Sequence, residues 1–215
     1  MSGRLIFAAR VVAAGAVAAS AIASNGFAAA TTYRVVPDKS PLRIEVGKGG
    51  ALGFVAGHTH EVEGRIQGRV TADMANLAHA EIQLTIRTAD LHVSGKGEPP
   101  DDVPTVQERM VGPDVLDVAR FPEIAFRSTS VAVSGPHDGS RTAGTMLRVT
   151  GELTLHGRTK PLTTDVHLRI DAASLTATGT LTVKQTDFGI KPVSVGGVVN
   201  VKDALTIHFT VTAAS

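Results

Sequence analysis

The chain has 215 residues, 21 Lys and Arg against 20 Asp and Glu, and no cysteine. This length fits one domain or at most a small pair, and the lack of cysteine excludes disulfides, thiolate metal sites and thiol nucleophiles. A net charge of +1 and an aromatic content of 4% provide no basic, base-stacking surface, so we expect no nucleic-acid partner.

Residues 1–30 have the pattern of a secretory signal peptide. Arg4 and Arg10 precede an almost continuous run of Ala, Val, Gly and Ile at residues 11–23, and three alanines end the segment at Ala30. The apolar run is shorter than the roughly 20 residues that a membrane-spanning helix needs. We therefore expect cleavage near Ala30, a periplasmic or secreted protein, and a mature chain of residues 31–215 without a transmembrane span.

From residue 31 onward, apolar and polar residues alternate, which is the pattern of strands with one buried face. Between residues 124 and 133 the apolar phase changes from even to odd positions, which predicts a bulge within one long strand. The clearest alternating runs cover residues 42–46, 80–86, 147–155, 162–170, 175–183 and 205–211.

One segment has a helical pattern. Thr105 and Glu108 form a Ser/Thr-x-x-Glu capping box, which predicts a short helix over residues 105–118. Gly112 and the proline after it would break this helix in two. Its apolar stripe would plug one end of a barrel.

The strand pattern predicts an all-β fold, an extended eight-stranded antiparallel barrel in meander order, which leaves no open sheet edge. Threonines and charged residues occupy the outer face, so the aliphatic face lines the interior, unlike in a membrane barrel. A barrel of this size either is filled by side chains or encloses one small ligand. Inward glycines such as Gly151 and Gly179 leave room, although they could also only relieve barrel curvature around a solid core.

Five sequence blocks occur in an order that resembles a known family. They are Tyr33-x-x-x-Pro-Asp-x-Ser40, Val62-x-Gly64-x-Ile66-x-Gly68, Val115-Leu116-Asp117-x-x-x-Phe121-Pro122-x-Ile124-x-Phe126-x-Ser128, Val149-x-Gly151-x-Leu153-x-Leu155-His156-Gly157-x-Thr159-Lys160 and Asp187-Phe188-Gly189-Ile190. As a set they resemble the YceI family of secreted proteins, although Gln185 stands where the family often has an arginine. The resemblance implies a lipocalin-like barrel that holds an isoprenoid, a quinone-like molecule or another long amphiphile in its pore, without established catalysis.

His58 and His60 are the sharpest local feature. Counting in steps of two along a strand, both share the face of Val62 and Ile66 and point inward. The pair could be a polar plug at a barrel end, a contact to a ligand head group, or part of a metal site that would need a third ligand. All three interpretations stay open at this point.

The predicted function is a non-covalent binder or carrier of a long-chain isoprenoid or similar amphiphilic lipid. No nucleophile elbow, phosphate-binding glycine loop or His-Glu-x-x-His motif is present, so we expect no catalytic residue and no enzyme. We also expect no metal and no cofactor other than such a lipid.

Two alternatives remain beside this prediction: a metal-binding or redox-accessory protein that uses His58 and His60, and a stress-related structural protein with a filled core. An enzyme ranks third, and formation of a homodimer also stays open. The predicted ligand contacts are Phe54, His58, His60, Val62, Ile66, Leu84, Ile86, Phe126, Leu153, Leu168, Leu181, Phe188 and Phe209. Among them, Phe188 could either cap the core or gate the pore.

Overall fold

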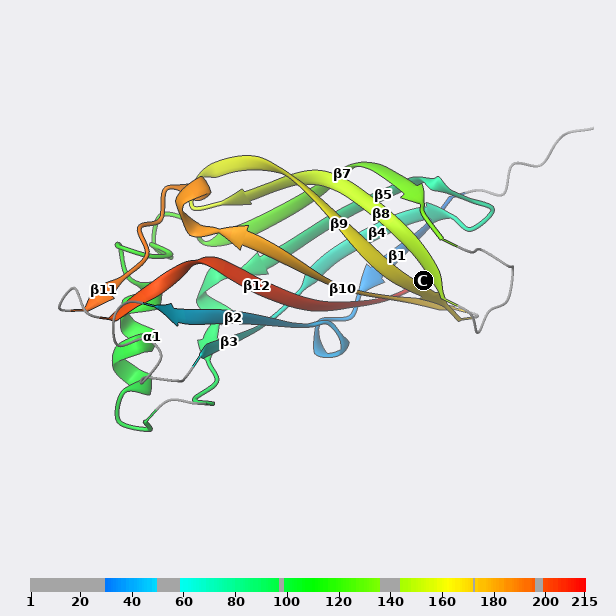
Figure 1. Cartoon of the computed structure of the whole chain (residues 1–215). Coiled ribbons are helices and arrows are strands. Elements are labelled where there is room, and N and C mark those ends of the chain that lie inside the picture. The colour runs from blue at the N-terminus through cyan, green and yellow to red at the C-terminus, as the bar shows by residue number, and fades with distance from the viewer. Residues whose placement is uncertain (1–29, 50–58, 97–98, 136–143, 172, 196–198) are drawn as a thin grey trace, which may run out of the picture.

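The computed structural model describes residues 30–49, 59–96, 99–135, 144–171, 173–195 and 199–215 (Figure 1). Within these residues the chain is a closed, elongated antiparallel barrel with one α-helix at one end. The predicted signal peptide lies outside the described residues apart from Ala30, so it stays a prediction. Among the described residues, no helix combines the length and the hydropathy that crossing a bilayer requires.

The described β elements combine into eight long strands, three of which are interrupted. The first is β1 (Thr31–Val35) and β2 (Pro41–Gly49), the second is β3 (His60–Arg65) and β4 (Gln67–Asp73), and the third is β5 (Asn76–Arg87) and β6 (His92–Val93). The other five are β7 (Glu123–Val133), β8 (Thr145–Leu155), β9 (Arg158–Ile170), β10 (Ser174–Lys184) and β12 (Val199–Ala214). The short β11 (Ser194–Val195) pairs with β12.

Each long strand pairs antiparallel with the next, and the last returns to the first. Leu42 of β2 lies opposite Phe209 of β12, and Arg34 of β1 lies opposite Ala214. These pairings close the barrel and confirm the predicted lipocalin-like, eight-stranded fold. The bulge predicted between residues 124 and 133 is also confirmed, because the register of β7 against β8 shifts between Ser128 and Ser130.

Side-chain burial follows the alternation along each strand. In β10, Leu175 and Val183 are buried on the inner face, whereas Thr178, Thr180 and Thr182 are exposed on the outer face. Threonine is β-branched and therefore favours strands, and its hydroxyl group can hydrogen-bond to water. The outer face can therefore be exposed to solvent without destabilising the sheet. The prediction of an aliphatic interior and a polar exterior is thus confirmed.

The helix differs from its prediction at both ends. It covers Val103–Val111 (α1) instead of residues 105–118, and Asp102 occupies its N-cap position without a side-chain hydrogen bond. Pro104 explains the early start, since a proline in the first turn fixes a helical φ and loses no intrahelical hydrogen bond there. The prediction that a capping box at Thr105 begins the helix was therefore wrong. The interruption at Gly112 is confirmed, but residues 113–118 form turns and not the predicted second half of the helix.

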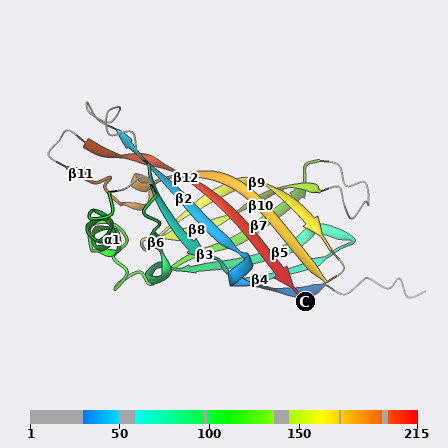
Figure 2. The ribbon, with the colours of Figure 1, turned by 90° about the horizontal axis from the view of Figure 1, so that it is seen from below.

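The two ends of the barrel are built differently (Figures 1 and 2). The helix α1 and β11 lie at one end, and the C-terminus lies at the other. At the C-terminal end the inward side chains are nearly fully buried: Ala72, Leu175 and Ala213 are between 0% and 3% exposed. These side chains therefore leave less open space at this end than further along the barrel.

Candidate ligand-binding cavity

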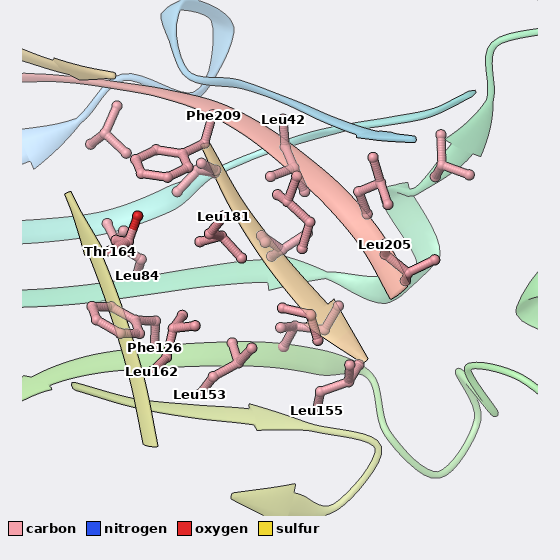
Figure 3. A pocket seen from close by; sticks show the side chains of 18 of the residues that line it. Leu42, Leu84, Phe126, Leu153, Leu155, Leu162, Thr164, Leu181, Leu205 and Phe209 are labelled. Atoms are coloured by element: carbon pink, nitrogen blue, oxygen red, sulfur yellow. The ribbon is translucent and has the colours of Figure 1, made fainter. Parts of the chain in front are cut away.

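A cavity of about 410 Å³ occupies the barrel interior. This volume falls in the range of roughly 300 to 1,000 Å³ that small-molecule sites occupy. Figure 3 shows leucines and the two phenylalanines Phe126 and Phe209 around this space, contributed by strands on several sides of the barrel. The alternative of a structural protein with a filled core is therefore contradicted.

The burial pattern shows where the barrel is hollow. Leu84, Leu153 and Phe209 face inward and line the cavity, yet they are only half-buried. Their inward neighbours toward the C-terminal end, such as Leu175 and Leu168, are buried. Because the outer surface is on the other side of the sheet, the exposed area of the half-buried residues faces the cavity. The cavity is therefore widest from the middle of the barrel toward α1, and it narrows toward the C-terminal end, where Ala72 and Leu175 still line it.

The helix α1 covers this end of the cavity. Val106 and Met110 line the cavity from α1, as their predicted apolar stripe suggested. Gln107 joins the helix to β6: its Oε1 accepts a hydrogen bond from the N–H of Val93 at 2.8 Å, and its Nε2 donates to the carbonyl of Leu91 at 3.0 Å. The amide of one side chain therefore pairs with the backbone of β6 much as a neighbouring strand would.

Among the described residues of the lining, which are mostly apolar, four have polar side chains: His60, Arg109, Thr164 and Gln185. Gln185 is 5% exposed, and its Nε2 donates a hydrogen bond to the carbonyl of Lys202 at 2.9 Å. It belongs to η3 (Gln185–Phe188), the short helical turn after β10. A predominantly apolar wall with few polar groups is typical of sites that hold a hydrophobic ligand.

An ion-pair cluster lies on the outer face of β3, behind the cavity wall. The carboxylate of Glu61, whose side chain is 11% exposed, lies 2.7 Å from Nζ of Lys96 and 3.2 Å from Arg43. The hydrogen bond from Lys96 lowers the pKa of Glu61 from 4.5 to about 2, against the opposing effect of burial. Because Lys96 follows β6 in the chain, this cluster fastens the start of the segment between β6 and α1 to β3.

The structure places most of the predicted contact residues on the cavity wall. Phe188 is instead buried in the core at 3% exposure within η3, as a cap would be. Phe54 and His58 lie outside the described residues. The residues on the wall are His60, Val62, Ile66, Leu84, Ile86, Phe126, Leu153, Leu168, Leu181 and Phe209. Contact of any of them with a ligand stays a prediction.

Sequence reasoning missed three polar residues of the described wall as ligand contacts: Arg109, Thr164 and Gln185. Thr164 continues the inward phase of Leu162 and Val166, so the alternation itself could have indicated it. Arg109 lies on the same side of the helix as Val106 and Met110, so the apolar stripe could have indicated it, but its charge argued against a place on an apolar wall. In the part of the chain that the structure describes, His, Asp and Glu side chains form no group of three that could hold a metal ion.

A closed eight-stranded barrel around an apolar cavity defines the class of lipocalin-like barrels. Within this class, the YceI-like domain model matches residues 33–213 of this chain. The chain therefore belongs to the YceI family, as the sequence blocks predicted.

The relatives agree with this assignment. A UPF0312 protein of Pseudomonas putida (strain W619) is 34% identical over 132 residues, which are 58% of this chain and 59% of that protein. The chain spans between 43% and 59% of the length of the first curated relatives that it matches.

Two solved structures share the fold. Burkholderia cenocepacia BcnA matches with a TM-score of 0.65 and 22% identity over 84% of this chain and 99% of that one. A polyisoprenoid-binding domain from Saccharophagus degradans, implicated in plant cell wall breakdown, matches with a TM-score of 0.57 and 14% identity over 85% of this chain and 98% of that one.

Proposed function

We propose that this chain binds or carries a long-chain isoprenoid, a quinone-like molecule or a similar amphiphilic lipid inside the barrel. The cavity of about 410 Å³ is the observation that carries this proposal, because its wall is almost entirely aliphatic and aromatic. Water in such a space gains few hydrogen bonds, so an apolar chain can replace it favourably. The Saccharophagus degradans domain, which shares the fold, is described as polyisoprenoid-binding, and this supports the same kind of ligand.

The energetics fit a chain of moderate length. Each buried CH₂ group contributes about 0.8 kcal/mol, so ten or more of them contribute on the order of 8 kcal/mol or more. This is comparable with the estimated cost of association, roughly 4 to 15 kcal/mol. Binding would therefore depend on the length of the buried chain, with the few polar wall residues adding specificity.

Family membership and this neighbour favour a binding protein over an enzyme. We further propose a periplasmic or secreted location, which rests on the signal-peptide pattern of residues 1–30. Formation of a homodimer remains an open alternative that size-exclusion chromatography can test.

The proposal is tested by native mass spectrometry and organic extraction of the protein purified without detergent. We expect a long-chain lipid to accompany the wild type. Leu84→Trp would reduce it because the indole enters the cavity, whereas Thr85→Trp, which adds the same bulk to the opposite face of β5, would not. A wild type that is empty and takes up no polyprenol when offered one would contradict the proposal.

A further inference from the structure

Polar groups of the cavity wall gather near the α1 end. The strand pairings place His60 of β3 and Gln185 after β10 at the level of Ala204 and Leu205 in β12. From this end toward the C-terminal end, the described wall is apolar except for Thr164. A ligand with one polar end would therefore direct that end toward α1.

Arg109 of α1 is the charged member of the described lining. It is also exposed, whereas the other described lining residues are buried or half-buried. A residue that both lines a cavity and meets solvent lies where the two join. Arg109 therefore stands at the rim of the cavity.

No carboxylate of the described residues forms an ion pair with Arg109. The positions three and four residues away from it, Thr105, Val106, Gly112 and Pro113, carry no negative charge that could reach it along the helix. A guanidinium group stays protonated at every pH at which the protein would work. The rim therefore presents a full positive charge without a protein partner in the described part of the chain.

Resting on the proposed function, we infer that the ligand is an amphiphile with an anionic head group, a carboxylate or a phosphate, which Arg109 selects at the rim. The apolar wall holds the hydrocarbon chain, and the charge remains near the opening because burial of an unpaired charge is costly. The planar guanidinium can donate two parallel hydrogen bonds to either oxyanion. Arg109 is a specificity residue in this arrangement, and the affinity comes mainly from the chain.

The test compares two probes of equal chain length on the delipidated protein: radiolabelled hexadecanoate and hexadecan-1-ol, at pH 8 and below their aggregation concentrations. We expect Arg109→Gln to weaken hexadecanoate binding about tenfold, the effect of one partly screened charge-assisted contact. Hexadecan-1-ol binding would stay unchanged, which also shows that the variant is folded. Arg169→Gln, an equal loss of charge on the exposed face of β9, is the matched control and would change neither.

A competition experiment with acetate distinguishes recognition of an amphiphile from binding of a free anion. We expect that acetate does not displace hexadecanoate. If Arg109→Gln leaves hexadecanoate binding unchanged, or if acetate competes as well as hexadecanoate does, the inference is overturned while the proposed function stands. If neither long-chain probe binds the wild type, the proposed function itself fails.

Discussion

Phe209 of β12 lies directly opposite Gly179 of β10, and its ring covers the space that a side chain at position 179 would need. A Cβ placed on Gly179 would come within 2.5 Å of Cζ of Phe209. The ring of Phe126, which lies opposite Leu153 on the neighbouring strand, likewise covers Gly151: a Cβ there would come within 2.5 Å of its Cζ. The two glycines thus let large rings lie against the wall instead of across the cavity, which explains how a barrel with phenylalanines inside stays hollow.

The first prediction follows from this pair. Gly179→Ala should turn the ring of Phe209 into the cavity and lower the amount of bound lipid. Because the ring can move into empty space, the free energy of unfolding should fall by less than the roughly 1 to 3 kcal/mol that overpacking costs in a filled core. Urea denaturation and lipid extraction measure the two effects.

Gly151→Ala provides the contrast, because a Cβ there would clash with the backbone carbonyl of Arg127, which cannot swing away, whereas the carbonyl of Asp165 would lie 3.1 Å from a Cβ at Gly179. It should destabilise the protein more than Gly179→Ala does. Equal stability losses for both variants would count against the idea that the cavity relieves the clash at Phe209.

The second prediction concerns the attachment of α1. Gln107→Ala removes both hydrogen bonds to β6, and we expect a loss of about 1 to 3 kcal/mol of stability at this contact and faster release of a bound chain. Hydrogen exchange at the amide of Val93 and the rate of ligand release measure the change. Glu108→Ala, an exposed position on the same helix, should alter neither; an equal effect of both substitutions would contradict the role of Gln107.

The third prediction is a pH dependence. The pKa of Glu61 is lowered to about 2, below its ordinary 4.5, so its ion pairs stabilise the folded state fully above about pH 4.5. This contribution is lost as the pH falls from there toward 2. Because Lys96 is largely exposed, we expect about 1 to 2 kcal/mol, less than an unscreened pair would give.

Denaturation of the wild type and of Glu61→Gln across this range measures the difference between them. The gap in stability should be widest above pH 4.5 and close toward pH 2. Glu152→Gln on the exposed face of β8 serves as the control and should show no such gap. A gap for Glu61→Gln that does not narrow with acid would show that the loss is not electrostatic.

The fourth prediction concerns Ser40, which is 0% exposed at the junction of β1 and β2. Its hydroxyl donates to the carbonyl of Val36 at 2.8 Å and accepts from the N–H of Thr212 at 3.0 Å, which holds the interrupted strand to β12. Ser40→Ala should therefore cost about 1 to 3 kcal/mol, because a buried backbone group loses its partner. Chemical denaturation measures the loss, and Ser130→Ala at an exposed position should be nearly neutral.

Most of the barrel could be predicted from the sequence, because the alternation of apolar and polar residues is a local property of each strand. Each run of apolar and polar residues indicates its own inner face, and the change of phase before Val131 was sufficient to locate the bulge of β7. The start of the helix was missed because the preference of Pro104 for a first turn outweighed the capping box at Thr105.

The end of the cavity was harder to predict. The apolar stripe of Val106 and Met110 indicated which side of α1 faces the barrel. The hydrogen bonds of Gln107 and the place of Arg109 depend on how α1 docks against β6, which the helix pattern does not encode. Phe188 is as hydrophobic as the wall residues, but it lies in η3, where the chain leaves the strand. Its position in the fold, and not its residue type, therefore makes it part of the core and not of the cavity wall.

The central claim is that an apolar chain occupies the barrel, and the absence of tryptophan from the sequence allows a direct test. Phe126→Trp puts a single indole on the cavity wall, and Arg127→Trp puts one on the exposed side of the same strand. A chain brominated near its middle should strongly quench the fluorescence of Phe126→Trp and leave that of Arg127→Trp nearly unchanged. Equal quenching at both positions, or none at position 126 under conditions in which the chain binds, would contradict the account.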